Sequence, residues 1–292
     1  MKKLLIQLDT SRHASVFDRV VAFDGGADEV LSYGSVEEKD VRDLVHGAIF
    51  TRGPKVLHHT AIFIGGTDMA AGERLLAAVR KTVFGPMRVS VMLDSNGSNT
   101  TAVAAVGRVA QAVGDLRGKR AVVLAGTGPV GMRAAGLLVK AGVAVTVTSR
   151  RPVDARWLDT LSTRFGGAAR AAVLTEPSQA GTVLEGAEIV IGAGPPGVCL
   201  ANKAAWAGRQ GLLALADLNA VPPLGIEGIE VTDSAAARDG ATVYGALGVG
   251  SLKMKIHKAC IARLFSRNDL VLDAETIADV AREIATPPPD VA

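Results

Sequence analysis

The most informative short motif in this chain is the glycine turn GTGPVG, which consists of Gly126, Thr127, Gly128, Pro129, Val130 and Gly131. It directly follows the apolar segment AVVLA and opens the amphipathic segment GMRAAGLLVKAG. In this context the first glycine permits a tight turn, the second lets the backbone approach a pyrophosphate, and the third allows close helix packing. A helix N-terminus also offers amide groups and a favourable dipole to such an anion. The turn therefore predicts a dinucleotide site.

The end of the next apolar segment indicates which dinucleotide is bound. Enzymes that use NAD place an acidic residue about 20 residues after the turn, where it binds the ribose 2′-hydroxyl. This chain has Ser149, Arg150 and Arg151 there instead. Because guanidinium groups bind phosphate oxygens through paired hydrogen bonds, the segment predicts NADP as the cofactor and NAD as a weaker acceptor. A solvated arginine pair without a ligand is the alternative.

Two later loops, residues 192–197 and 217–223, end further apolar segments of the same half of the chain. In an open parallel sheet such loops lie at the carboxyl ends of the strands, where ligands bind. We therefore expect Ala193, Gly194, Asp217 and Asn219 to contact the cofactor near its nicotinamide. The alternative is a pair of ordinary surface turns.

A second polar cluster, DSNGSNTT, spans residues 94–101. Asp94, Asn96, Asn99 and Thr100 offer donors and acceptors suited to a flat heterocycle that is rich in N–H and C=O groups. Ser98 or Asn99 could instead cap the helix that follows.

Three basic residues, Lys253, Lys255 and His257, share one segment that is expected to be helical, LKMKIHKACIARLF. Lys253 and His257 are four positions apart and so lie on one face of such a helix. That face can look into a cleft, whereas a solvated basic face is the alternative.

These residues need a scaffold, and the order of apolar and amphipathic segments provides one. Short apolar runs alternate with amphipathic runs along most of the 292 residues, which predicts an α/β fold with largely parallel sheets. Helices are expected over about 99–114, 128–141 and 251–265, and TVYGALGVG is expected to be a strand. We predict a doubly wound Rossmann-type domain over 106–257 and a second α/β domain over 1–105, completed by 258–292. A chain of this length favours two domains, with a cleft between them.

Composition excludes several other classes of protein. The net charge of +3 is small, and the basic residues are scattered among acids, so nucleic acid is not an expected partner. No apolar stretch reaches the roughly 18 residues needed to span a bilayer, so no membrane association and a cytoplasmic location are expected. The two cysteines and five histidines show no metal-ligand spacing, so no metal site is predicted.

Several longer strings together resemble one family. They are SVFD at 15–18, FDGGADE at 23–29, IGGTDMAAGER at 64–74, LDSNGSNTT at 93–101, VVLAGTGPVGMR at 122–133, NAVPPLGI at 219–226 and GALGVGSLKMKIHKACIA at 245–262. They resemble the NADP-dependent methylene-tetrahydromethanopterin dehydrogenases of methylotrophic bacteria, and the similarity spans nearly the whole chain.

The resemblance implies reversible hydride transfer from methylene-tetrahydromethanopterin to NADP, giving the methenyl form, in one-carbon metabolism. Methylene-tetrahydrofolate is a further substrate of some relatives. The family's functional lysine corresponds to Lys253, within a string that departs from the family at Met254 and Ile256. The pterin side is expected to include Asp18, Asp94, Ser95, Asn96, Ser98, Asn99, Thr100, Lys255 and His257. A homo-oligomer is expected.

Three alternatives to this interpretation stay open. A methylene-tetrahydrofolate dehydrogenase/cyclohydrolase usually carries a tyrosine and lysine pair, and the only tyrosines are Tyr33 and Tyr244. A shikimate-type dehydrogenase needs a lysine and aspartate pair, for which Lys55 with Asp68 or Asp94 is conceivable. A protein that senses NADP without catalysis would bind the cofactor but turn over no pterin.

Overall fold

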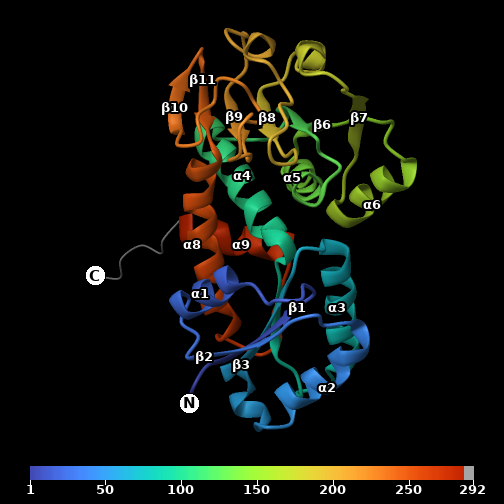
Figure 1. The fold of residues 1–292 in the computed structure, drawn as a ribbon, viewed down its shortest axis with the longest axis vertical. Helices are drawn as coiled ribbons and strands as arrows, with labels where there is room; N and C mark the ends of the chain where they lie inside the picture. Colours follow the sequence, from blue (N-terminus) through green and yellow to red (C-terminus); the bar gives the residue numbers. More distant parts are fainter. Residues whose placement is uncertain (286–292) are drawn as a thin grey trace. The chain divides into compact units, whose positions relative to one another are not determined.

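The computed structural model describes residues 1–285, which fold into two compact units (Figure 1). Unit 1 is formed by Met1–Thr100 with the segment that starts at Met254, and unit 2 by Thr101–Lys253. The chain passes between them within α4 (Ser98–Val113) and within α8 (Ala246–Leu264). The domain boundaries expected from the sequence, 105 and 257, fall within the same two helices. Within residues 1–285, no helix combines the length and the apolar composition that a bilayer requires.

Unit 1 is built on a parallel sheet that has five strands within the described residues, in the order β12-β4-β3-β1-β2. Its elements are β1 (Leu4–Asp9), α1 (Val16–Asp24), β2 (Glu29–Tyr33), α2 (Glu38–Ile49), β3 (Thr60–Gly65), α3 (Met69–Thr82), β4 (Ser90–Leu93), β12 (Val271–Leu272) and α9 (Ala274–Ala285). A short 3-10 helix, Pro54–His59, precedes β3, and another, Ser95–Gly97, follows β4.

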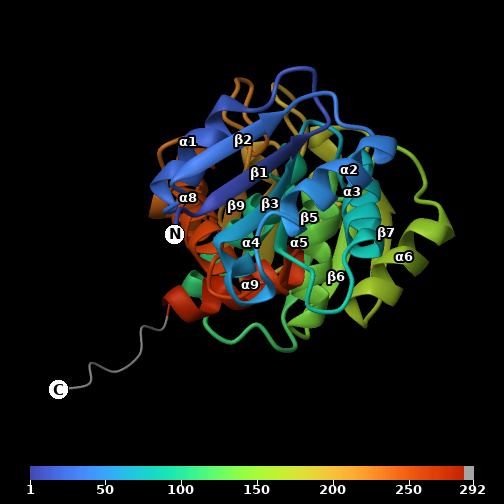
Figure 2. The same cartoon turned by 90° about the horizontal axis from the view of Figure 1, so that it is seen from below.

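The two faces of this sheet are covered by different helices. Ile6 and Leu8 of β1 belong to one apolar core with residues of α2 and α3. Successive strand residues point to opposite faces, so Gln7 and Asp9 face the other side. There the ring of Phe63 on β3 stacks on His257 of α8, with centroids 5.5 Å apart. Figures 1 and 2 show α2 and α3 on one side of the sheet and α1 with the end of α8 on the other.

Unit 2 contains a seven-stranded sheet in the order β10-β11-β9-β8-β5-β6-β7. Only β10 runs antiparallel to its neighbour. Its elements are β5 (Arg120–Leu124), α5 (Pro129–Lys140), β6 (Ala144–Ser149), α6 (Ala155–Phe165), β7 (Ala169–Val173), α7 (Ala180–Val183), β8 (Ile189–Gly192), β9 (Ala214–Asp217), β10 (Ser234–Arg238) and β11 (Ala241–Tyr244), with 3-10 turns at Pro177–Gln179 and Lys203–Ala205. The six parallel strands follow the Rossmann order, which reverses between β5 and β8. The predicted fold class is therefore confirmed.

One predicted element is wrong: the segment after Tyr244 is helical, and α8 begins at Ala246 instead of near Ser251. Strand β11 pairs with β9 only as far as Tyr244, so the following amides need other partners. The amides of Gly245 and Leu247 donate to the carbonyls of Asp233 and Val231, each at 2.9 Å, and the amide of Val249 makes a helical hydrogen bond to the Gly245 carbonyl at 3.0 Å. The segment ALGVG therefore begins a helix and not a strand, with Val249 buried and Leu247 exposed.

Glu188, just before β8, provides a test of how the first strands of unit 2 are held together. Its Oε1 lies 3.0 Å from Lys119 Nζ, and its Oε2 accepts the amide of Arg120 at 3.0 Å. The hydrogen bond from Lys119 lowers the pKa of Glu188 below its ordinary 4.5. A carboxylate whose pKa is lower in the folded state stabilises the fold above its unfolded pKa and loses that contribution as the pH falls through the folded value.

We expect Glu188→Gln to reduce the free energy of unfolding by about 1 kcal/mol at pH 7. The difference from the unaltered chain should shrink as the pH falls below 4.5. Denaturant unfolding at a series of pH values measures it. A difference of the same size at low pH would show that the charge of Glu188 does not carry the effect.

Candidate active site

The glycine turn lies between β5 and α5, beside the point where the strand order of unit 2 reverses. The amide of Ala125 donates to Thr148 Oγ1 at 2.9 Å, and the amide of Gly126 donates to the Thr148 carbonyl at 3.0 Å. A Cβ added at Gly126 would lie 2.8 Å from the carbonyl oxygen of Val123, and one at Gly131 would lie 2.6 Å from Gly126 Cα. Packing within the protein therefore requires glycine at positions 126 and 131.

Gly128 requires a different explanation. Its backbone is extended, with φ −72° and ψ 171°, a conformation that any residue adopts. The closest atom to an added Cβ would be the Ala125 carbonyl oxygen at 3.9 Å. Neither strain nor packing explains this glycine, whereas close approach of a phosphate to the start of α5 does. The turn, with Thr127, Pro129 and Val130, thus fits a dinucleotide pyrophosphate.

The residues predicted to read the ribose lie at the end of β6, the strand that pairs with β5. Ser149 is the last residue of β6 and is half-buried, while Arg150 and Arg151 follow it with exposed side chains. The amide of Arg151 donates to Ser149 Oγ at 3.4 Å. Arg150 and Arg151 thus follow the carboxyl end of the strand next to β5, which is the end of the sheet where a Rossmann domain binds its nucleotide.

Asp217 and Asn219, which we predicted to contact the cofactor, hold the loop after β9 in shape. The carboxylate of Asp217 accepts the amide of Asn219 at 3.1 Å and that of Ile226 at 2.9 Å. Burial raises the pKa of Asp217, against the opposing effect of these backbone donors. Asn219 Oδ1 accepts the amide of Val221 at 2.9 Å, and its Nδ2 donates to the Pro223 carbonyl at 3.0 Å. Through these hydrogen bonds both residues fix the conformation of the loop after β9.

Ala193 and Gly194 follow β8, the neighbour of β5 in the sheet. The amide of Ala193 donates to the carbonyl of Leu124 at 3.0 Å, which fixes the start of this loop to the end of β5. The amide of Gly197 donates to Asn219 Oδ1 at 3.4 Å, so the loops after β8 and β9 are joined. The backbone of both loops therefore lies at the ligand-binding edge of the sheet.

In unit 1, the buried Asp94 follows β4 and caps α4. Its Oδ1 accepts the amides of Asn99 and Thr100 at 2.9 and 3.0 Å, and its Oδ2 accepts the Thr100 hydroxyl at 2.6 Å. Ser98 or Asn99 was the alternative considered for a helix cap, and the structure gives that role to Asp94. The three residues Asp94, Asn99 and Thr100, at most 1% exposed, thus build the start of the helix.

The other polar residues of this loop divide by exposure. Ser95 is buried, and its hydroxyl donates to the Gly65 carbonyl at 2.9 Å. Ser98 is also buried, and its hydroxyl has no hydrogen-bond partner within the described residues. Asn96 is exposed, with a left-handed backbone at φ 54°, and its amide donates to the Gly66 carbonyl at 2.5 Å. Of the amides and hydroxyls predicted here, Asn96 is the one presented to solvent.

The three basic residues predicted on one helix all lie in α8, but in different surroundings. Lys253 is half-buried, Lys255 is exposed, and His257 is completely buried against Phe63. Lys253 and Lys255 lie about 200° apart around the helix axis. They therefore point to opposite sides of α8, and the two lysines do not share a face.

Comparison with known proteins identifies the family. Residues 16–96 match the family model described as methylene-tetrahydromethanopterin dehydrogenase, N-terminal. The chain is 49% identical over 286 residues to the bifunctional protein MdtA of Methylorubrum extorquens, covering 97% of this chain and 99% of the relative. It is 30% identical over 294 residues to the NAD(P)-dependent methylenetetrahydromethanopterin dehydrogenase of the same organism, with the same coverage. The chain belongs to the methylene-tetrahydromethanopterin dehydrogenase family.

Solved structures share the fold of this dehydrogenase at low identity. Shikimate 5-dehydrogenase from Listeria monocytogenes, in complex with shikimate and NAD, matches with a TM-score of 0.55 and 13% identity, covering 98% of this chain and 96% of that chain. Ornithine carbamoyltransferase from Gloeobacter violaceus gives a TM-score of 0.58 and 14% identity, with coverage of 90% and 86%. A dehydrogenase and a transferase match about equally well, so the likeness shows the architecture alone.

One residue near the predicted pterin side of the dehydrogenase was missed from the sequence. Asp9 ends β1 and is 1% exposed, and Asp18 lies in the first turn of α1. A Cβ added at Gly65 would lie 3.1 Å from Asp9 Oδ2 and 3.5 Å from Asp18 Oδ2, so both carboxylates border the end of β3. The available signal was an aspartate at the carboxyl end of the first predicted strand.

The lysine and aspartate pair of a shikimate-type site does not form in this dehydrogenase. Lys55 precedes β3, whereas Asp68 caps α3 after β3 and Asp94 follows the parallel strand β4. Lys55 lies at the amino end of the strands and the two aspartates lie at the carboxyl end, and the six residues of β3 separate these ends by about 20 Å. That alternative is therefore excluded.

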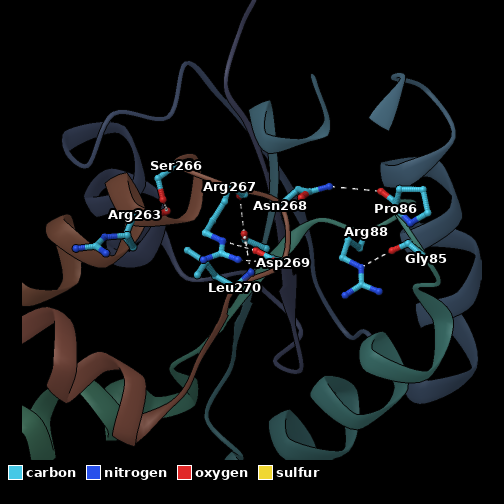
Figure 3. A network of polar contacts seen from close by, with 10 residues as sticks. Gly85, Pro86, Arg88, Arg263, Ser266, Arg267, Asn268, Asp269 and Leu270 are labelled. Carbon is cyan, nitrogen blue, oxygen red and sulfur yellow. Dashed lines mark hydrogen bonds and ion pairs between the residues drawn. The ribbon is translucent and has the colours of Figure 1, made fainter. Parts of the chain in front are cut away.

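Lys55 instead lines a hollow of about 420 Å³ at the amino ends of the strands, with Arg88 and Asn268 among its neighbours. Figure 3 shows the contacts around it, in which Arg88 donates to the Gly85 carbonyl at 2.5 Å. Polar residues therefore lie at both ends of the strands, but only those at the carboxyl ends include the predicted pterin contacts.

Proposed function

We propose that the protein oxidises methylene-tetrahydromethanopterin reversibly to the methenyl form, with NADP+ as the hydride acceptor. The observation that carries this proposal is the 30% sequence identity to an NAD(P)-dependent methylenetetrahydromethanopterin dehydrogenase, which extends over nearly the full length of both chains. The geometry of Gly128 supports it independently, because an added Cβ would meet no protein atom closer than 3.9 Å, so neither packing nor backbone strain explains the glycine.

The reaction makes modest demands on side chains. Loss of a hydride from the N–CH2–N carbon leaves a cation that both nitrogens stabilise, so no general base is needed. NADP+ supplies the nicotinamide carbon that accepts the hydride. The protein must chiefly orient its substrate and keep water from the product. This fits a site whose buried carboxylates, Asp94 and Asp217, bond to backbone amides.

Each unit has its own part in the proposal. Unit 2 would hold NADP through the glycine turn, Arg150 and Arg151, and the loops after β8 and β9. Unit 1 would hold the pterin through Asp18 and the loop at 94–100, with Lys253 as the residue that orients it. The homo-oligomer remains a prediction, which sedimentation of the purified protein would test.

The function is tested by an absorbance assay with methylene-tetrahydromethanopterin and methylene-tetrahydrofolate, each with NADP+ and with NAD+. We expect the fastest turnover with the methanopterin and NADP+, and slower turnover with NAD+. Turnover of the folate would agree with the word bifunctional in the name of the 49% identical relative. Cofactor binding without turnover of either pterin would favour the NADP-sensing alternative.

Arg150 and Arg151 should determine the preference for NADP+. Replacing both with alanine is expected to raise the KM for NADP+ by about ten- to a hundredfold, because charge-assisted hydrogen bonds to a phosphate contribute about 1.5–3 kcal/mol. The KM for NAD+, which lacks the 2′-phosphate, should change less than about threefold. Arg156→Ala, at an exposed arginine in the first turn of α6, is the control. An equal loss with both cofactors would contradict the assignment.

A further inference from the structure

The backbone of Ser15, the residue that caps α1, is held by two buried side chains of β1. Asp9 Oδ2 accepts the amide of Ser15 at 3.0 Å, and Gln7 Nε2 donates to the carbonyl of Ser15 at 3.2 Å. Gln7 and Asp9 are alternate residues of one strand and point to the same face of the sheet, and each is 1% exposed. Together they bind both the backbone N–H and the backbone carbonyl of Ser15.

The same two side chains are fixed by further bonds. Asp9 Oδ1 accepts the amide of Ser11 at 2.8 Å, so one carboxylate spans the whole loop from β1 to α1. Gln7 Oε1 accepts the hydroxyl of Ser32 on β2 at 2.7 Å, which sets the orientation of its amide. Buried polar groups are costly unless they are bonded, and these bonds satisfy both side chains.

Ser15, held in this way, is hydrogen-bonded directly to Asp18. The hydroxyl of Ser15 accepts the amide of Asp18 at 3.2 Å, so the cap fixes the first turn of α1. Asp9 and Asp18 both border Gly65, and an added Cβ there would approach a carboxylate oxygen of each. A shift of Ser15 would therefore move the Asp18 carboxylate relative to the end of β3.

We propose that Gln7 and Asp9 are positioning residues for the pterin site, which act by holding the first turn of α1 so that Asp18 meets the substrate. This inference rests on the proposed function and goes beyond it, because it assigns a role to two residues whose side chains are buried and bonded to other parts of the protein. An asparagine at position 9 keeps one acceptor and cannot receive both amides. A methionine at position 7 keeps the length of the side chain and removes both hydrogen bonds.

The test compares Asp9→Asn and Gln7→Met with Asp28→Asn in the full-length protein. Asp28, which precedes β2, is the control: its carboxylate accepts the amide of Lys3 at 2.7 Å, just before the amino end of β1. We expect Asp9→Asn and Gln7→Met to lower kcat/KM for the methylene-pterin about tenfold, mainly through KM, with NADPH affinity unchanged. Asp28→Asn should change kcat/KM less than twofold. Unchanged kinetics in both β1 variants would overturn the proposal.

A double-mutant cycle with Asp18→Asn distinguishes a route through Asp18 from a general loss of stability. If Asp9 acts through Asp18, the Asp9→Asn change should lower kcat/KM less than about twofold when Asp18 is already asparagine. A second tenfold loss in that background would overturn the proposal, because it would show that Asp9 acts independently.

Amide hydrogen exchange tests the hydrogen bonds that hold Ser15 without an enzyme assay. The amides of residues 11–18 should exchange at least about tenfold faster in Asp9→Asn, and those in β5 and α5 of unit 2 should not change. Unaltered exchange at 11–18 would overturn the proposal. An unaltered protein that turns over no pterin would overturn the proposed function instead, and faster exchange would then still show that Asp9 holds the start of α1.

Discussion

The Gly128→Ala variant is expected to fold as the unaltered protein does and to bind NADPH about ten- to a hundredfold more weakly, a loss of about 1.4–2.8 kcal/mol. The methyl group would meet no protein atom closer than the Ala125 carbonyl oxygen at 3.9 Å, and the backbone at Gly128 suits any residue. The added atom therefore falls in the space where the pyrophosphate would approach the start of α5. Fluorescence titration with NADPH measures the affinity, and thermal unfolding without cofactor measures the stability.

Gly131→Ala is the matched variant in the same turn, with the opposite expectation. A Cβ at this position would lie 2.6 Å from Gly126 Cα, so the turn and the helix must move apart. We expect a loss of about 1–3 kcal/mol in the free energy of unfolding, as in other overpacked sites. If Gly128→Ala also unfolds at a lower temperature, or binds NADPH as tightly as the unaltered protein, the ligand-based explanation of Gly128 is wrong.

The position of the glycine turn between a strand and a helix could be predicted from the sequence because its determinants are local. The turn, the strand before it and the helix after it are consecutive, and the order of the segments fixes which edge of a parallel sheet they share. Arg150 and Arg151 needed only their place after the next strand. None of these assignments depends on contacts between residues that are distant in the sequence.

The roles of the buried carboxylates could not be predicted in the same way. Asp94 and Asp217 were predicted as ligand contacts, and the structure shows in addition that their oxygens accept backbone amides of residues that follow them in the chain. Asp9 was not predicted as a site residue, because its contacts are with the amide of Ser15 and with Gly65, which lies far along the chain. The sequence shows that a carboxylate follows a strand, but the donors that reach it depend on tertiary packing.

Secondary structure was least predictable where neighbouring strands decide it. Strands β7 (Ala169–Val173) and β10 (Ser234–Arg238) are rich in alanine, which has a low strand propensity, and they form at the two edges of the sheet of unit 2. The start of α8 was predicted as strand because its apolar residues suit either structure. The segment is helical because β11 stops pairing with β9 at Tyr244, so the following backbone needs other hydrogen-bond partners.

Replacing Lys253 with alanine is expected to lower kcat/KM for methylene-tetrahydromethanopterin about a hundredfold, since a substrate misplaced by about 1 Å loses that much of its rate. The resemblance predicts that Lys253 is the functional lysine, and its side chain is half-buried in α8. Because the reaction needs no base, we expect the loss to come from substrate orientation and from poorer protection of the methenyl product against water. NADPH affinity should be unchanged.

Lys255→Ala is the control for charge and for the helix. The sequence predicted Lys255 on the pterin side, but its side chain is exposed and points away from the side of α8 that carries Lys253, so we expect kcat/KM to change less than about twofold. Lys253→Arg separates charge from shape: it keeps the positive charge but places it on a longer, planar group, so it should recover little of the lost activity. The assay follows NADPH formation together with the ratio of methenyl product to its hydrolysed form. Unchanged kinetics and an unchanged product ratio in Lys253→Ala would remove this residue from the site and leave Asp18 as the principal contact to test on the pterin side.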